Sequence, residues 1–100
     1  MYVWFFMTKK EKQHLEKVAS IGCVACRMLG YFGTPAEIHH IKGKNMLGKK
    51  ASHFETIPLC PYHHRTSDEA YHHSPKKFTE KFGTQEELLE YTREILKWHG

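Results

Sequence analysis

The chain has 100 residues, 40% of them apolar and 26% charged, and a formal net charge of +4 when its nine histidines are neutral. This length predicts one domain over residues 1–100, and no apolar run approaches the roughly 18 residues that a membrane span requires. The composition therefore excludes a membrane-spanning protein and favours a basic protein that binds a polyanion.

A helix is predicted directly after an apolar start. Residues 1–7, MYVWFFM, are too few to cross a bilayer, and we interpret them as a segment that docks. Thr8 and Glu11 then have the spacing of a capping box. Apolar side chains recur every three to four residues over 8–20, which predicts a helix ending near Ser20.

Two short strands are predicted on either side of a lysine-rich loop. Residues 37–41, EIHHI, and residues 56–60, TIPLC, are short segments with β-branched residues. Residues 42–50 between them are dominated by lysine and glycine, which indicates a loop. Residues 61–66, PYHHRT, look like the start of a helix.

The remainder of the chain is predicted to be helical. Ser74 and Pro75 form an N-cap with proline at the first helical position, and Gly83 ends that helix. Thr84 and Glu87 form a second capping box. The buried stripe of the last helix consists of Leu88, Leu89, Tyr91, Ile95 and Trp98. The elements together predict an α+β fold with helices at both ends.

Two knuckles have the spacing of a zinc site. Cys23 and Cys26 are separated by two residues, and so are Cys60 and His63. Two such pairs complete a tetrahedral shell with no open position, which predicts a structural zinc that stabilises a small core. An odd cysteine count suits metal ligation in a reducing compartment better than disulfides, so we expect a cytoplasmic protein. The alternative is that the cysteines are buried small residues and His63 is a surface histidine.

Two adjacent histidines, His39 and His40, lie in the first predicted strand. Because successive side chains of a strand point to opposite faces, we expect the two imidazoles to have different roles. One can bind a metal ion, and the other can take a proton from water. His64 can offer a second nitrogen to that metal from the start of the following helix. Alternatively, these imidazoles are structural. The remaining isolated histidines, His14, His53 and His99, are interpreted as surface residues.

Basic residues flank these histidines on both sides. The loop after the first strand carries several lysines and no acidic residue, and more basic residues follow the second strand. Such a cluster can neutralise DNA phosphates without reading sequence, although a charge run is more often a solvated surface. The predicted DNA-binding residues are Lys42, Lys44, Lys49, Lys50, Arg65, Lys76 and Lys77.

The segments EIHHIKG and TIPLCPYHHR resemble the signature of the HNH endonucleases, whose ββα-metal fold clasps one catalytic metal. More narrowly, the chain resembles the phage and prophage nucleases of the recombination-enhancement, RecA-dependent type. These combine the core with an upstream cysteine knuckle and a downstream segment similar to HHSPKKFTEKFG. The similarity runs from about Cys23 to Leu89. It implies a small ββα-metal core at about 23–82 with zinc knuckles and flanking N- and C-terminal helices.

The resemblance also implies a role for each histidine of the motif. His40 corresponds to the general base, and His39 and His64 correspond to ligands of the catalytic metal. By the same resemblance, His72 can touch the metal or the scissile phosphate. The family usually has an asparagine before the second strand, where this chain has Glu and Thr at 55–56. The residue that orients His40 is therefore not assigned.

The expected function is hydrolysis of phosphodiester bonds in DNA by a metal-dependent endonuclease or nickase, in phage-type recombination. Its expected cofactors are a structural zinc and a catalytic divalent ion such as Mg²⁺, Mn²⁺ or Zn²⁺. DNA is the expected partner and a recombinase filament is a candidate partner, while the oligomeric state is left open. The alternatives are a zinc-stapled DNA-binding module without catalysis and a recombination accessory that acts through a protein partner.

Overall fold

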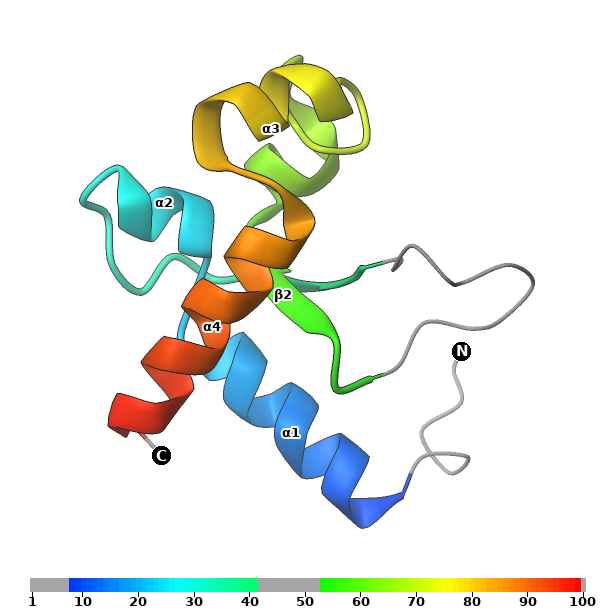
Figure 1. Ribbon diagram of the computed structural model, residues 1–100, viewed down its shortest axis with the longest axis vertical. Helices are drawn as coiled ribbons and strands as arrows, with labels where there is room; N and C mark the ends of the chain where they lie inside the picture. The colour runs from blue at the N-terminus through cyan, green and yellow to red at the C-terminus, as the bar shows by residue number, and fades with distance from the viewer. Residues whose placement is uncertain (1–7, 42–52, 100) are drawn as a thin grey trace.

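The computed structural model describes residues 8–41 and 53–99 (Figure 1). Within these residues the chain forms two antiparallel strands, four α-helices and one short π-helix, which confirms the predicted α+β class. In chain order the elements are α1 (Lys9–Ser20), α2 (Val24–Met28), β1 (Glu37–His40), β2 (Thr56–Leu59), η2 (Tyr62–Thr66), α3 (Pro75–Phe82) and α4 (Gln85–His99). None of the helices in this described part is long and apolar enough to cross a membrane.

Helix α1 begins at the predicted capping box. The Thr8 hydroxyl accepts a hydrogen bond from the Glu11 backbone at 3.1 Å, and the Glu11 carboxylate accepts one from the Thr8 backbone at 2.9 Å. After the helix, Gly22 adopts a φ of +81°, and a Cβ there would lie 3.0 Å from the carbonyl oxygen of Thr34. This glycine therefore permits the close backbone approach that precedes Cys23.

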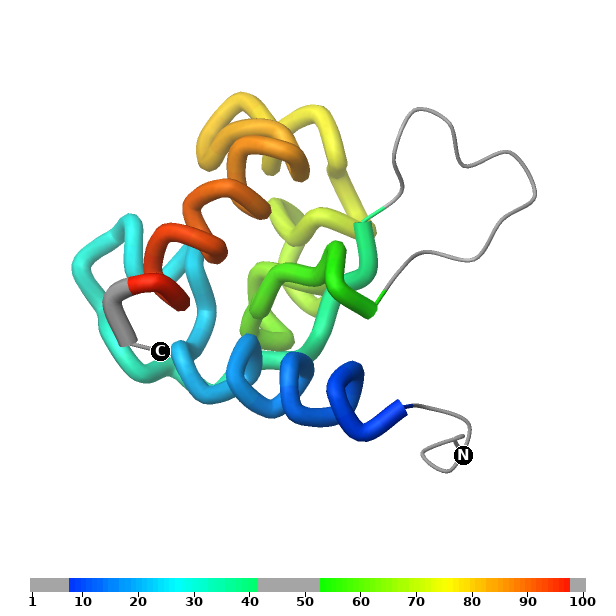
Figure 2. The backbone as a smooth tube through the Cα atoms, turned by 60° about the horizontal axis from the view of Figure 1, so that its bottom comes forward, coloured from blue at the N-terminus to red at the C-terminus, as the bar shows by residue number. Residues whose placement is uncertain are grey.

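The two strands pair in a fixed register, with Glu37 opposite Leu59 and His40 opposite Thr56. All four residues of β2 are buried, and α1, α2 and α4 all pack against this strand. Figure 2 shows β2, in green, between α1 and the part of the chain that contains α3 and α4. The strand pair is therefore the centre on which the helices are placed.

The C-terminal helices begin and end where the sequence predicts. Pro75 is the first residue of α3, and Gly83, with a φ of +110°, follows its last residue. Thr84 and Glu87 exchange the two hydrogen bonds of a capping box at 2.8 and 3.1 Å, so α4 begins at Gln85.

One apolar core joins these elements. Its members come from all the α-helices and from both strand regions, and the cysteines of the predicted zinc site belong to it. Among its fully buried members are Val18, Val24, Ile57, Leu59, Phe78 and Leu88. Of the predicted stripe of α4, Leu88, Leu89 and Ile95 are buried and Tyr91 is partly buried. The side chain of Trp98 lies outside the described part, as do residues 1–7, which were interpreted as a docking segment.

Candidate metal centres

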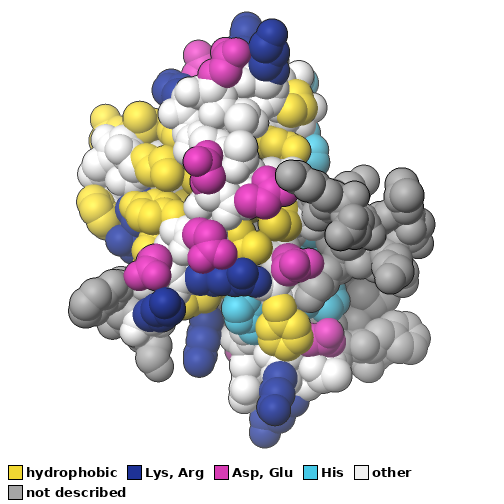
Figure 3. All heavy atoms as spheres, viewed as in Figure 1, with side chains coloured by type: hydrophobic (Ala, Val, Ile, Leu, Met, Phe, Trp, Pro, Cys, Tyr) yellow, Lys and Arg dark blue, Asp and Glu magenta, His cyan; other side chains and the backbone are white. Residues whose placement is uncertain are grey.

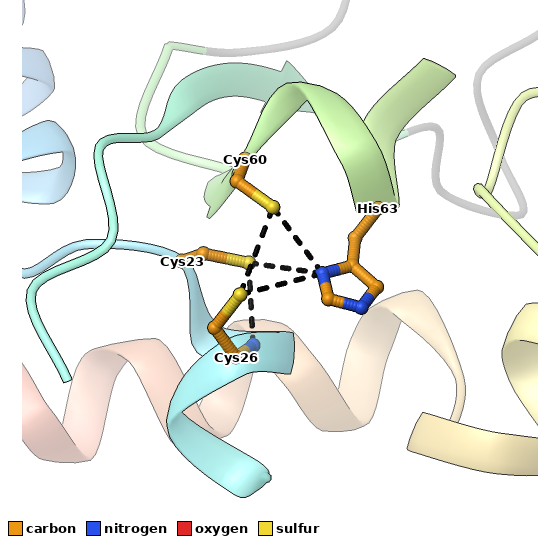
Figure 4. Close-up of side chains that lie close together, drawn as sticks. All are labelled: Cys23, Cys26, Cys60 and His63. Atoms are coloured by element: carbon orange, nitrogen blue, oxygen red, sulfur yellow. Dashed lines mark hydrogen bonds between the residues drawn. The ribbon is translucent and has the colours of Figure 1, made fainter. Parts of the chain in front are cut away.

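The structure brings together the four predicted zinc ligands. Cys23 is the N-cap of α2, Cys26 lies within α2, Cys60 follows β2 and His63 lies in η2. All four side chains are buried, and Figure 4 shows them pointing toward one another. The three cysteines are free thiols that form no disulfide.

The distances in this cluster fit a tetrahedral ion. The Sγ atoms of Cys26 and Cys60 are 3.7 Å apart. From Nδ1 of His63, the Sγ atoms of Cys60, Cys26 and Cys23 lie at 3.3, 3.5 and 3.8 Å. A tetrahedral zinc with Zn–S of about 2.3 Å and Zn–N of about 2.0 Å places its ligands about 3.5–3.8 Å from one another. The cluster can therefore hold a metal ion such as zinc.

The pKa shifts in the cysteine cluster also fit a bound metal ion. Burial, followed by the neighbouring cysteines, raises the pKa of the Cys23 thiol to about 12 against the opposing backbone hydrogen bonds. Burial also lowers the pKa of His63, which leaves its ring neutral with a lone pair to donate. Because burial disfavours the thiolate of Cys23, a cation bound in the cluster would stabilise that thiolate.

Three further histidines form a second cluster. His39 comes from β1, His64 from η2 and His72 from the connection between η2 and α3. Nε2 of His64 lies 3.2 Å from Nδ1 of His39 and 3.1 Å from Nε2 of His72. Nitrogens that share one metal at about 2.0–2.1 Å are about 3.0–3.4 Å apart. This cluster also fits a metal ion, and His72 is exposed, so the site is open to solvent on one side.

Two side-chain oxygens contact the far sides of these rings. Oε1 of Glu37 accepts a hydrogen bond from Nδ1 of His64 at 2.8 Å, and Oε1 of Gln85 accepts one from Nε2 of His39 at 2.9 Å. Arg65 donates to both oxygens of Glu37, with Nη2 at 2.7 Å from Oε2. These hydrogen bonds from Arg65 and then His64 lower the pKa of Glu37 to about 2. The carboxylate is therefore ionised at neutral pH.

Three imidazoles of this region, those of His39, His40 and His72, have pKa values below the usual value for histidine. His39 is only 4% exposed, and burial is the main reason that its pKa falls to about 4, with His64, His72 and His40 adding like-charge repulsion. Burial also lowers the pKa of His40 and of His72. Neutral rings keep the lone pairs that metal binding and proton transfer require.

The adjacent histidines of β1 have different partners, as the strand alternation predicts. While His39 belongs to the second cluster, Nε2 of His40 lies 2.9 Å from Nδ1 of His53. His53, interpreted from the sequence as a surface residue, is partly buried, and its ring contacts that of His40. His14 is also partly buried, beside the ring of Phe54.

The two histidines of β1 line the same hollow in the surface. It is lined by His39, His40, Tyr71, His72 and Gln85. A group bound in this hollow can therefore touch the second cluster and the ring of His40 together.

The predicted DNA-binding residues are only partly covered by the structure. Lys76 and Lys77 are exposed in the first turn of α3, and Arg65 is exposed but paired with Glu37. The loop lysines Lys42, Lys44, Lys49 and Lys50 lie outside the described residues. Their segment joins Ile41 to His53, and these ends lie close together because His40 contacts His53.

Sequence reasoning missed three residues of this region. Glu37 lies two residues before His39 in a strand, so the alternation of side chains could have placed both on one face. Gln85 meets His39 from 46 positions away, and His53 meets His40 across the lysine-rich segment. No local sequence pattern marks either of these two contacts.

A comparison with known families finds the same family that the sequence motifs resemble. A family model described as recombination enhancement, RecA-dependent nuclease matches residues 7–97. The match includes both clusters, His40 and His53. The chain therefore belongs to the family of recombination-enhancement, RecA-dependent nucleases.

Proposed function

We propose that this protein is a metal-dependent DNA endonuclease of the ββα-metal, or HNH, type that nicks DNA by hydrolysing phosphodiester bonds. The observation that carries the proposal is the shared hollow, in which His39 and His72 of the three-histidine cluster line the same space as a separate histidine, His40. The nuclease family supports the reaction class. The antiparallel pair β1 and β2, followed by the short η2, supports the ββα-metal core.

His39, His64 and His72 would hold the catalytic cation, which leaves coordination positions open toward the solvent side. A divalent cation there would neutralise charge on the scissile phosphate and on the leaving 3′ oxygen. Mg²⁺, Mn²⁺ and Zn²⁺ are the candidates, and the three imidazole ligands favour zinc or another transition metal among them.

His40 is the proposed general base. Its contact with His53 engages Nε2, so Nδ1 of the neutral ring is left to accept the proton of the attacking water. In this proposal His53 orients His40. It replaces the asparagine that the family usually has before the second strand and that this chain lacks. A base held in one orientation has the geometry for proton transfer more often than a freely rotating ring has, so the reaction is faster.

The second metal site has a separate, structural role in the proposal. Cys23, Cys26, Cys60 and His63 would surround a zinc ion completely, and a closed shell leaves no position for substrate. Ligands held as thiolates suit a reducing compartment, so we place the protein in the cytoplasm. We propose a single domain over residues 1–100.

DNA is the proposed substrate, with backbone contacts from Lys76, Lys77 and the loop lysines. Figure 3 shows one face on which acidic and basic side chains are interspersed, and on α4 the pairs Arg93–Glu90 and Lys97–Glu94 are formed. That mixed face would attract a polyanion less than residues 42–50, which contain four lysines and no acidic residue. The family description further supports an action in recombination that depends on RecA. We propose, from the resemblance of the sequence, that a RecA filament is the partner and that the recombination is of the phage or prophage type.

Conversion of supercoiled plasmid to nicked circles tests the proposal. The protein is stripped of loosely held metal and supplied with Mg²⁺, Mn²⁺ or Zn²⁺, with and without a RecA filament that carries single-stranded DNA homologous to the plasmid. We expect nicking with at least one ion, loss of nicking in His40→Ala, and normal nicking in the control His73→Ala. DNA binding without any nicking under all these conditions would instead support the non-catalytic DNA-binding module.

A further inference from the structure

Two side-chain oxygens accept hydrogen bonds from two rings of the second cluster, on the side of each ring that faces away from the cluster. Oε1 of Glu37 and Oε1 of Gln85 contact the ring nitrogens of His64 and His39 that face away from the cluster. A carboxylate oxygen and an amide oxygen can only accept hydrogen bonds. The protons must therefore lie on Nδ1 of His64 and on Nε2 of His39.

This assignment decides what faces the interior of the cluster. When each ring carries one proton, at the position that its oxygen partner requires, Nε2 of His64 and Nδ1 of His39 both present lone pairs, and these atoms are 3.2 Å apart. Two lone pairs cannot form a hydrogen bond with each other, so the arrangement is unfavourable unless a cation lies between them. The outer contacts thus make the pair of rings a binding site for a cation.

We propose that Glu37 and Gln85 are positioning residues that fix the ring tautomers of His64 and His39 so that both lone pairs point at one cation. The inference rests on the metal centre of the proposed function and adds residues that neither the sequence motif nor the family match assigns. Oxygen acceptors behind histidine ligands are a general means of fixing ring orientation and raising ligand basicity.

Both positioning residues are themselves held in place. Glu37 lies on the same strand face as His39, and Arg65 donates hydrogen bonds to both of its oxygens, with the shortest at 2.7 Å. Gln85 is the first residue of α4, and the capping box of Thr84 and Glu87 fixes the start of that helix. Acceptors on anchored elements hold their histidines more accurately than acceptors on free loops would.

Calorimetric titration with zinc tests the inference without reference to catalysis. The protein is prepared with one equivalent of zinc in the cysteine cluster, and the dissociation constant of the second equivalent is measured. Glu37→Ala and Gln85→Leu should each weaken this second binding by about 10- to 100-fold. Gln85→Glu keeps an oxygen acceptor and should bind at least as tightly as the wild type. Glu94→Ala, which removes an exposed ion pair on α4, is the matched control and should change nothing.

Nitrogen NMR of the histidine rings provides a second measurement, the tautomer of each ring. A general loss of packing would not change the tautomers in the way expected here. Before the second equivalent is added, His64 should carry its proton on Nδ1 and His39 on Nε2. In Glu37→Gln, which preserves the shape of the side chain but loses its charge, the population of this His64 tautomer should fall.

The outcomes separate this inference from the proposed function. The inference is overturned if Glu37→Ala and Gln85→Leu bind the second zinc as the wild type does, if Gln85→Glu loses as much affinity as Gln85→Leu, or if the wild type takes up no second equivalent. Wild-type protein that shows the expected order of affinities but never nicks DNA would leave the positioning roles intact and contradict only the nuclease.

Discussion

At the scale of single residues, the contacts of each histidine decide its chemistry. His39 and His40 are neighbours in the chain, yet one meets Gln85 and the other meets His53. His63 and His64 are neighbours too, yet the first faces three thiols and the second faces Glu37. The alternation of side chains could be predicted from sequence, but the partners could not, because they come from distant segments.

The contact between His40 and His53 makes a prediction about catalysis. If His53 orients the base, His53→Ala should lower kcat for nicking by about ten- to a hundredfold, because a misplaced base costs rate without weakening substrate binding. The KM and the affinity for the catalytic metal should stay close to wild type. Steady-state nicking and metal titration measure these quantities.

The exposed His73 provides the matched control for this substitution. His73→Ala should retain wild-type kcat. Unchanged kcat in His53→Ala would show that His40 is oriented by something else, and a loss of metal affinity in that variant would make His53 part of the metal centre.

At the scale of elements, η2 connects the two clusters. Cys60 and His63 contribute to the cysteine cluster, and His64, the next residue, contributes to the histidine cluster. The cysteine cluster also ties α2 to the end of β2. A zinc ion there would therefore fix the orientation of η2 and, through it, the position of His64.

This connection predicts the effect of breaking the zinc cluster. Cys60→Ser should bind less zinc and lose about 3 kcal/mol or more of unfolding free energy, which lowers the thermal midpoint by roughly 12 °C or more in a chain of this size. Zinc analysis and thermal melting measure both effects. Wild-type protein that contains no zinc and melts unchanged in strong chelator would contradict the structural role.

The elements themselves were predictable to different degrees. Both capping boxes and the proline at the start of α3 mark helix ends with local hydrogen-bond chemistry, and these boundaries were confirmed. The sequence after Gly22 predicts a metal knuckle but no helix, and the segment forms the short helix α2 with Cys23 as its N-cap. A helix of five residues is decided by its tertiary contacts rather than by its own sequence pattern.

At the scale of the whole molecule, the net charge of +4 and the lysines of residues 42–50 make a prediction about DNA binding. Neutralising Lys42, Lys44, Lys49 and Lys50 together should weaken DNA binding and reduce the slope of log affinity against log salt, because fewer counterions are released. The fold should be unaffected. Binding measured at several salt concentrations, with circular dichroism as a check on folding, tests this prediction.

An equal change of net charge elsewhere is the control. Glutamine at Lys17, Lys81, Arg93 and Lys97 also removes four positive charges, three of which are already paired with Glu69, Glu90 and Glu94. This variant should keep most of the salt slope. Equal slopes in the two variants would show that DNA responds to net charge and not to the loop.

The class of the fold, the cysteine cluster and the pairing of His39 with His64 could be predicted because ligand spacing and paired histidines are local signals, whereas His72 was implied only by the family resemblance. The supports of the histidine cluster could not be predicted as a set. Gln85 reaches His39 only because α4 packs on β2, and Arg65 reaches Glu37 only because η2 lies beside β1. Such contacts exist only once the chain has folded, and single-sequence patterns do not encode them.

The central claim is the division of labour between His40 and the histidine cluster, and metal titration of plasmid nicking tests it most directly. His39→Ala and His64→Ala should lose metal affinity, so high metal concentrations should restore part of their activity. His40→Ala should lose about a hundredfold or more of the rate at every metal concentration, because a missing proton acceptor is not replaced by metal. Rescue of His40→Ala by metal would make His40 a ligand rather than the base, and unchanged nicking in all three variants would contradict the nuclease site itself.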